Sequence, residues 1–263
     1  MGVVEAIILG IVQGLTEFLP ISSSGHVELG SALLGIQTSE NLLFLIIVHS
    51  ATALSTIVVY RKDISSILSG LLKFEKNDSW DFTFKILISA IPVFIIGVFF
   101  KEEVESFFGG RVGLVGSMLI ITSVLLAFTY FAKERAGKIS YFKSLLIGIS
   151  QALAVLPGIS RSGATISTAL LSGVKREEAT RFSFLMVLLP IIGASLLDIM
   201  DIIQNPESRI GISFITLISG FIAAFVTGII ACRWMIKIVK KGKLIYFSIY
   251  CLIIGLIALI STL

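Results

Sequence analysis

Six apolar runs, each long enough to cross a lipid bilayer, constrain what this chain can fold into. A spanning helix needs about 20 consecutive, mostly apolar residues. Hydrophobic residues make up 56% of the chain and charged residues 14%, and no polar stretch is long enough to surround a separate soluble core. The sequence therefore predicts an all-α integral membrane protein that forms a single membrane domain over residues 1–263. The expected full transmembrane helices are residues 42–60, 82–100, 112–131, 181–200, 212–238 and 244–262.

Two further apolar segments, 3–19 and 141–156, are too short for full crossings. Each is followed by a proline, a turn rich in Ser and Gly, and a second short helical piece. Irregular backbone at membrane depth persists only inside protein or beside water. We therefore expect two re-entrant helical hairpins in addition to the six spans. The first segment lacks the basic start and the cleavage site of a signal peptide, so we expect it to stay in the fold.

Basic residues gather in alternate loops, and this predicts the orientation of the chain. Loops rich in Lys and Arg remain cytoplasmic, so the acidic loops around Glu102 and Asp201 are expected outside. Both termini then lie on the outer face of the plasma (inner) membrane, in a multi-pass topology. Residues 64–74 have helical apolar spacing, which fits a surface helix or a plain connecting helix. The basic loop residues are Arg61, Lys62, Lys73, Lys76, Lys133, Arg135, Lys138, Lys143, Lys237, Lys240, Lys241 and Lys243.

The two hairpin segments are copies of one another. Residues 10–35 align with 148–173 without a gap, and ten of the 26 positions are identical. Each copy begins a unit of one hairpin and three spans, with units at about 1–131 and 139–263. An odd number of crossings makes this an inverted repeat, in which the two turns meet near the midplane of the membrane. The identical pairs include Gln13/Gln151, Ser22/Ser160, Ser24/Ser162 and Gly25/Gly163.

The copies differ at positions that carry charge. Val155, Arg161 and Ala164 stand where the first copy has Glu17, Ser23 and His26. A charge near the bilayer centre costs roughly 2.5–3.5 kcal/mol even on a lenient scale, so such a residue usually has a function. The alternative is a purely structural ion pair between Glu17 and Arg161 that locks the hairpins together.

The second turn, PGISRSG, has the composition of an anion clamp. Ser160, Arg161 and Ser162 lie in a glycine-flanked turn that opens a short helix, where backbone N–H groups are free. The guanidinium group adds a planar fork that matches two phosphate oxygens. This turn is therefore predicted to bind a phosphate group.

The first turn, SSSGH, supplies candidates for nucleophilic chemistry. Ser23 and His26 are three residues apart, so in a helical turn the imidazole can lie beside the hydroxyl as a base or an acid. Either Ser22 or Ser24 is expected to cap the helix. His49, in the first full span, either lines the cavity or bonds a neighbouring helix.

The segments VQGLTEFLPISSSGH, 12–26, and LPGISRSGAT, 156–165, resemble the two signature motifs of the undecaprenyl-pyrophosphate phosphatase family linked to bacitracin resistance. The resemblance extends over the whole chain in length, repeat and span order. It implies a membrane hydrolase that removes the terminal phosphate from a polyprenyl pyrophosphate and so recycles the lipid carrier for cell-wall glycans. It also implies a divalent cation and a site open to the outer (periplasmic or extracellular) face.

The resemblance assigns roles by position. Glu17, Ser23, His26 and Arg161 fall on the catalytic positions. Glu17 is also the expected ligand of the cation, which is Mg²⁺ with Ca²⁺ as the alternative, and the family's other acidic position is a glutamine here. Mg²⁺ retains several waters, so Glu17 and pyrophosphate oxygens are enough to hold it. The expected substrate-binding residues are Gln13, Ser22, Ser24, Ser160, Ser162 and Thr165.

The expected partners are the polyprenyl pyrophosphate and membrane lipids, and a homodimer is left open. Nucleic acid is excluded as a partner because the net charge of +4 is modest and scattered. Cys232 and Cys251 lie in apolar runs without metal-ligand neighbours, either facing lipid or packed inside. Two other functions remain open: a transporter or flippase of an anionic prenyl lipid, which commonly has this architecture, and a scaffold without chemistry.

Overall fold

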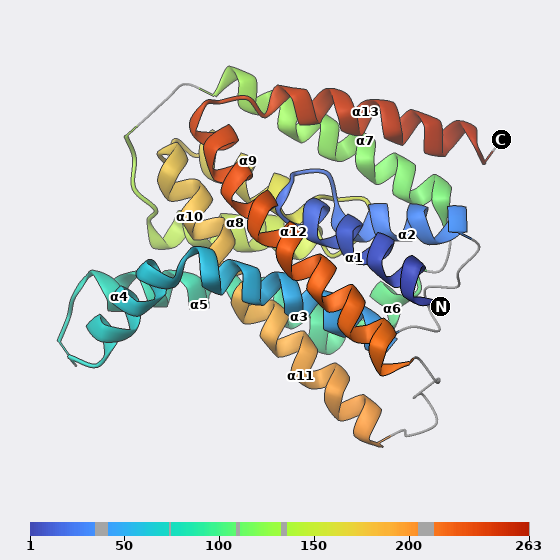
Figure 1. The fold of residues 1–263 in the computed structure, drawn as a ribbon. Helices are drawn as coiled ribbons and strands as arrows, with labels where there is room; N and C mark the ends of the chain where they lie inside the picture. Colours follow the sequence, from blue (N-terminus) through green and yellow to red (C-terminus); the bar gives the residue numbers. More distant parts are fainter. Residues whose placement is uncertain (35–41, 74, 109–110, 133–135, 205–212, 263) are drawn as a thin grey trace.

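The computed structural model describes residues 1–34, 42–73, 75–108, 111–132, 136–204 and 213–262 (Figure 1). Within these ranges all regular elements are helices, apart from one isolated bridge between Gly137 and Val174. The helices are α1 Val3–Phe18, α2 Ser23–Leu34, α3 Leu42–Val59, α4 Arg61–Leu71, α5 Asp78–Phe99, α6 Lys101–Glu105, α7 Val112–Phe128, a 3₁₀ turn Thr129–Phe131, α8 Tyr141–Leu153, α9 Arg161–Leu171, α10 Arg176–Met186, α11 Leu188–Gln204, α12 Phe214–Lys240 and α13 Ile245–Ile260.

All six apolar runs are helical, and the chain is an all-α, multi-pass membrane protein. Among the described residues, four helical stretches are long and apolar enough to cross a bilayer by themselves. α3 reaches that length only together with α4, which bends away from it by 77°, and α13 has 16 residues. The count of six full crossings therefore stays a prediction. The four stretches are Asp78–Phe99, Val112–Phe131, Arg176–Leu197 and Phe214–Lys240.

Each of the two expected hairpin segments forms a pair of short helices, while their re-entry into the membrane stays a prediction. α1 packs against α2, and α8 packs against α9. Each break contains a proline, Pro20 or Pro157, which lacks the N–H group that a continuing helix requires. The amphipathic segment after α3 forms α4, none of whose residues is buried. The sharp bend before it and its exposed surface suit a helix lying along a membrane face.

Each hairpin packs mainly on helices from the other half of the chain. α1 lies along α12, α8 lies along α5, and α7 pairs with α13 (Figure 1). Glycines at equivalent repeat positions allow these contacts: a Cβ atom on Gly10 would lie 2.5 Å from the Gly220 carbonyl oxygen, and one on Gly148 would meet that of Ser89. Small residues let helix backbones approach closely within a membrane. In this exchanged packing each hairpin rests on helices of the other predicted unit, and the bounds of the two units stay a prediction.

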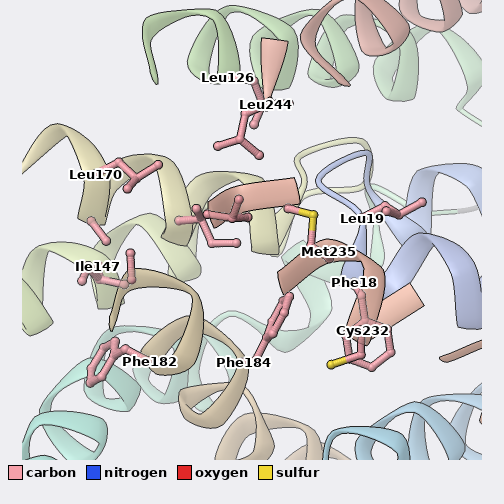
Figure 2. Packing of buried hydrophobic residues seen from close by; sticks show 14 of the residues in the cluster. Phe18, Leu19, Leu126, Ile147, Leu170, Phe182, Phe184, Cys232, Met235 and Leu244 are labelled. Carbon is pink, nitrogen blue, oxygen red and sulfur yellow. The ribbon is translucent and has the colours of Figure 1, made fainter. Parts of the chain in front are cut away.

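A buried apolar cluster surrounds the end of the first hairpin helix. Figure 2 shows Phe18 beside Phe184, Met235 and Cys232. The Phe18 and Phe184 rings meet edge to face with centroids 5.6 Å apart. Both cysteines are fully buried, Cys232 in this cluster and Cys251 on α13, so they pack inside the protein and do not face lipid. This dense packing holds the end of α1 in place, directly beside Glu17.

Candidate active site at the meeting of two hairpin turns

The turns of the two hairpins are joined by direct hydrogen bonds. The backbone N–H of Gly158 donates to Ser22 Oγ over 3.1 Å, and Ser162 Oγ donates to the Leu19 carbonyl oxygen over 3.1 Å. Thr122 on α7 accepts from the Ser160 N–H over 3.0 Å and donates to the Gly158 carbonyl over 3.0 Å. The expectation that the two turns lie together is confirmed.

Ser22 holds the first turn in an unusual backbone conformation. Its φ of 70° lies in the left-handed region, which is uncommon for a residue other than glycine. The side chain accepts hydrogen bonds from the N–H groups of Gly25, at 3.3 Å, and of Gly158. Ser22 therefore caps α2 and fastens it to the second hairpin, as predicted for one of the two serines. Ser24 lies near it, with 3.4 Å between the two hydroxyls.

Glu17 is the point on which donors from both hairpins converge. Arg161 forms an ion pair with Oε1, while Gln13 Nε2 and Ser23 Oγ donate to Oε2 over 2.8 and 2.7 Å. The Glu17 side chain is only 4% exposed, whereas that of Arg161 is 26% exposed. The carboxylate therefore lies behind the guanidinium and the Ser23 hydroxyl.

The remaining residues of the second turn shape it from within. Ser160 is the N-cap of α9 and accepts from the Gly163 N–H over 3.1 Å. Thr165 donates to the Arg161 carbonyl over 2.9 Å, and its hydroxyl lies 2.5 Å from that of Ser183 on α10. Both residues are only 1% exposed. Direct contact of Ser160 or Thr165 with substrate stays a prediction, because their hydroxyls are already engaged inside the protein.

His26 is paired differently from the sequence expectation. Its Nδ1 lies 2.8 Å from the Ser22 carbonyl oxygen, and its Nε2 lies 2.9 Å from the hydroxyl of Tyr250, whose ring stacks on the imidazole. A carbonyl only accepts, so Nδ1 donates and a neutral Nε2 accepts from Tyr250. The Ser23 hydroxyl donates to Glu17 and not to His26. The acid or base role of His26 stays a prediction, and Tyr250 was not anticipated.

A cavity of about 460 Å³ opens beside these groups, within the size range of ligand pockets. Among the described residues, its lining holds one permanently charged side chain, Arg161, and no carboxylate. His49 contributes to this lining and bonds the Leu45 carbonyl of its own helix, so the cavity alternative holds for His49. The polar lining residues are Ser23, Ser24, His49, Gln151, Arg161 and Ser195; the apolar ones include Val93, Val104, Phe108, Val155 and Ile191.

A smaller hollow is lined by both members of the ion pair. It has a volume of about 10 Å³, close to the room that one water needs. Glu17, Arg161 and Ser162 line it together with hydroxyl side chains from α3 and α10, namely Thr52, Thr56 and Ser183. This hollow places further polar groups beside the carboxylate, which the sequence did not reveal because they belong to distant helices.

The described residues do not fit a cation held by the protein alone. No cluster of three or more His, Cys, Asp or Glu side chains occurs within the described ranges. Glu17, the predicted ligand, already accepts hydrogen bonds from Gln13 and Ser23 and pairs with the Arg161 guanidinium. In this arrangement the carboxylate is neutralised by a cation of the protein itself, the Arg161 guanidinium.

Comparisons with known proteins agree with this arrangement over nearly the whole chain. The family described as bacitracin resistance protein BacA matches residues 6–257. A protein of Bacteroides fragilis named undecaprenyl-diphosphatase is 54% identical over 257 residues, which cover 97% of each chain. Proteins of the same name from Parabacteroides distasonis and Korarchaeum cryptofilum are 54% identical over 260 residues, 98% of each chain, and 40% identical over 278 residues, 100% of each chain. With the match of the family model to residues 6–257 and these relatives over almost its full length, the chain belongs to the BacA bacitracin resistance family.

Proposed function

We propose that this protein is a membrane phosphatase that hydrolyses undecaprenyl pyrophosphate to the monophosphate, and so recycles the lipid carrier of cell-wall glycan synthesis. The observation that carries the proposal is the Ser23–Glu17–Arg161 arrangement. Ser23 and Arg161 border a cavity whose described lining residues include no carboxylate. A nucleophile, a base and an anion-binding cation thus lie together where an acidic headgroup is attracted. The names of relatives with 52–54% identity agree with this activity.

Arg161 is the group that recognises the terminal phosphate. Its guanidinium is partly exposed and borders the cavity, while its partner carboxylate is buried behind it. A phosphate that enters offers two oxygens to the planar guanidinium fork. The arginine then shifts from Glu17 towards the substrate, and the carboxylate gains the freedom to accept a proton.

The Ser23–Glu17 hydrogen bond provides the attacking group. In one route Ser23 Oγ attacks the terminal phosphorus while its proton passes to Glu17, and the bond between phosphorus and the bridging oxygen breaks. Undecaprenyl phosphate leaves, and water then hydrolyses the serine phosphate. In the other route, Ser23 and Glu17 hold a water that attacks directly. His26, buttressed by Tyr250, is the candidate for a second proton transfer in either route.

The lipid tail and the outer face complete the proposal. Apolar side chains from α5, α11 and the end of α6 line the part of the cavity away from the turns, and they suit the first isoprene units. Entry from the outer (periplasmic or extracellular) leaflet agrees with the loop charges described above. A divalent cation, Mg²⁺ or Ca²⁺, and a homodimer stay predictions, and EDTA in the assay tests the first of them.

The deciding experiment is phosphate release from undecaprenyl pyrophosphate by purified protein in detergent, where no second compartment exists for transport. We expect release by the wild type and a loss of about 100-fold or more in kcat for Glu17→Gln, because a positioned general base contributes about 10²–10⁴-fold. Arg161→Lys keeps the charge but loses the fork, and we expect it to raise KM as well. Ser219→Ala, a hydroxyl that bonds only its own helix, is the control.

Each outcome of this assay decides something specific. A serine phosphate trapped by rapid quench supports the covalent route, whereas full activity in Ser23→Ala eliminates it. Failure of well-folded wild type to release phosphate, with either cation and with shorter prenyl chains, overturns the phosphatase and leaves binding or transport of an anionic lipid. Size-exclusion profiles that match the wild type show that each variant is folded.

A further inference from the structure

Gln151 has a buried amide group that nothing in the described part of the chain satisfies. The residue lies near the end of α8 and exposes only 2% of its surface. Neither Nε2 nor Oε1 has a hydrogen-bond partner. An amide that is buried without partners retains the full cost of its desolvation. Such a group therefore usually has a ligand, a water or a role in binding.

Gln151 also lines the 460 Å³ cavity that Arg161 and Ser23 border. Within the described ranges, the lining of this cavity contains the Arg161 guanidinium and no carboxylate, so the charge of these residues is positive. A ligand that fits the polar end of this cavity is therefore an anion rich in acceptors, such as a pyrophosphate. The amide Nε2 carries two N–H donors, which phosphate oxygens accept and which an apolar tail does not.

The repeat explains why this amide is available. In the first hairpin the equivalent residue is Gln13, whose Nε2 donates to Glu17 over 2.8 Å. In the second hairpin the position of Glu17 is occupied by Val155, which also lines the cavity. A carboxylate at that place would repel a pyrophosphate and would engage the amide internally. Its replacement by Val155 removes the repulsion and leaves the Gln151 donors for the ligand.

We infer that Gln151 is a substrate-binding residue whose Nε2 donates to a non-bridging oxygen of the pyrophosphate headgroup. The inference rests on the proposed function and adds a contact that none of the motif residues makes. A neutral donor binds the headgroup about equally in the substrate complex and in the transition state, because it does not contact the charge that develops during the reaction. Loss of this donor is therefore expected to raise KM and to leave kcat nearly unchanged.

Two substitutions at this position test whether Gln151 donates a hydrogen bond to the headgroup or only fills space. Gln151→Met keeps the length and removes both polar atoms, and we expect KM to rise about tenfold with kcat within about threefold of wild type. Gln151→Glu removes the donors and adds a negative charge, so its KM is expected to exceed that of Gln151→Met. Ser167→Ala is the matched control, because it deletes another buried, unpartnered polar group, a hydroxyl that lies outside the cavity lining.

The unfolding temperature of Gln151→Met separates a binding role from a structural one. A structural role predicts a lower unfolding temperature, whereas a binding role does not. Without ligand, Gln151→Met is expected to unfold at the same temperature as wild type or higher, because an unsatisfied amide is replaced by an apolar chain. Inorganic pyrophosphate, used as the headgroup alone, should raise the unfolding temperature of wild type more than that of Gln151→Met.

The outcomes distinguish this inference from the proposed function. If wild type releases phosphate but Gln151→Met keeps the wild-type KM, the inference is wrong and the phosphatase stands. A KM for Gln151→Glu no higher than for Gln151→Met also overturns it, since the amide then donates to no anion. A marked loss of stability in Gln151→Met without ligand assigns the amide to the fold instead.

Discussion

His26 and Tyr250 form the contact of the site that joins the first turn to the last helix. The hydroxyl of Tyr250 fixes the imidazole from the side opposite its bond to the Ser22 carbonyl. A histidine held at both nitrogens has one orientation and one preferred tautomer, which is useful for proton transfer.

Tyr250→Phe is therefore expected to reduce kcat for phosphate release by about 2- to 10-fold, the range that corresponds to one ordinary hydrogen bond. The ring still stacks, so only the hydrogen bond is removed. Tyr246→Phe, an exposed tyrosine one turn earlier on α13, serves as the control. If His26 transfers a proton, the pH profile of kcat shifts in Tyr250→Phe alone. Identical profiles in the two variants would remove His26 from the chemistry.

At the level of residues, the sequence predicts side chains whose chemistry conflicts with their surroundings. Glu17 and Arg161 stand out because a charge within an apolar run is costly, and the structure brings them together. Tyr250 and Thr52 do not stand out, because aromatic and hydroxyl residues are common in membrane helices. Their distance along the chain from the hairpins gives no periodicity that assigns them to the site.

Among the elements, the second hairpin depends on a glycine at its turn. Gly158 has a φ of +99°, and a Cβ atom there would lie 2.5 Å from the Val115 carbonyl oxygen and 2.7 Å from Met118 Cβ. Both the backbone conformation and the contact with α7 exclude a side chain. The turn that carries Arg161 is thus positioned by close contact with a span of the first repeat unit.

Gly158→Ala is expected to destabilise the protein by roughly 2–4 kcal/mol, the combined cost of left-handed strain and overpacking. The matched control is Gly193→Ala in α11, where a Cβ atom meets nothing within 4 Å and alanine favours the helix. Unfolding temperatures of the purified variants in detergent provide the measurement. A Gly158→Ala protein as stable as Gly193→Ala would contradict the close contact with α7.

Helices and breaks are predictable here because each depends on nearby residues. Apolar runs, prolines and Ser-Gly turns mark where α1, α8 and the hairpin turns begin and end. The number of full crossings is less certain from sequence, since α3 with its 77° bend and the short α13 do not reach the standard length alone. Pairing of the turns through Ser22 and Gly158 follows from the repeat, but its hydrogen bonds do not.

For the whole molecule, loop charges predict that both termini face the outside. In a background with Cys232 and Cys251 replaced by alanine, Gly2→Cys is expected to react with a membrane-impermeant maleimide on intact cells. Lys241→Cys, in the exposed turn between α12 and α13, is expected to react only after permeabilisation. The reason is the lysine-rich charge of that turn, which retains it in the cytoplasm. Reversed labelling of the two positions would invert the topology and place the cavity entrance on the other face.

The exchanged packing of the hairpins also imposes an order on biosynthesis. α1 leaves the ribosome long before α12, the helix on which it rests. Glu17 likewise enters the membrane before Arg161, its partner 144 residues further along the chain. The nascent first half therefore carries a carboxylate without its countercharge, which is costly within a bilayer. The pair between Glu17 and Arg161 can therefore form only after the second hairpin has been synthesised, and the helix that supports α1 follows later still.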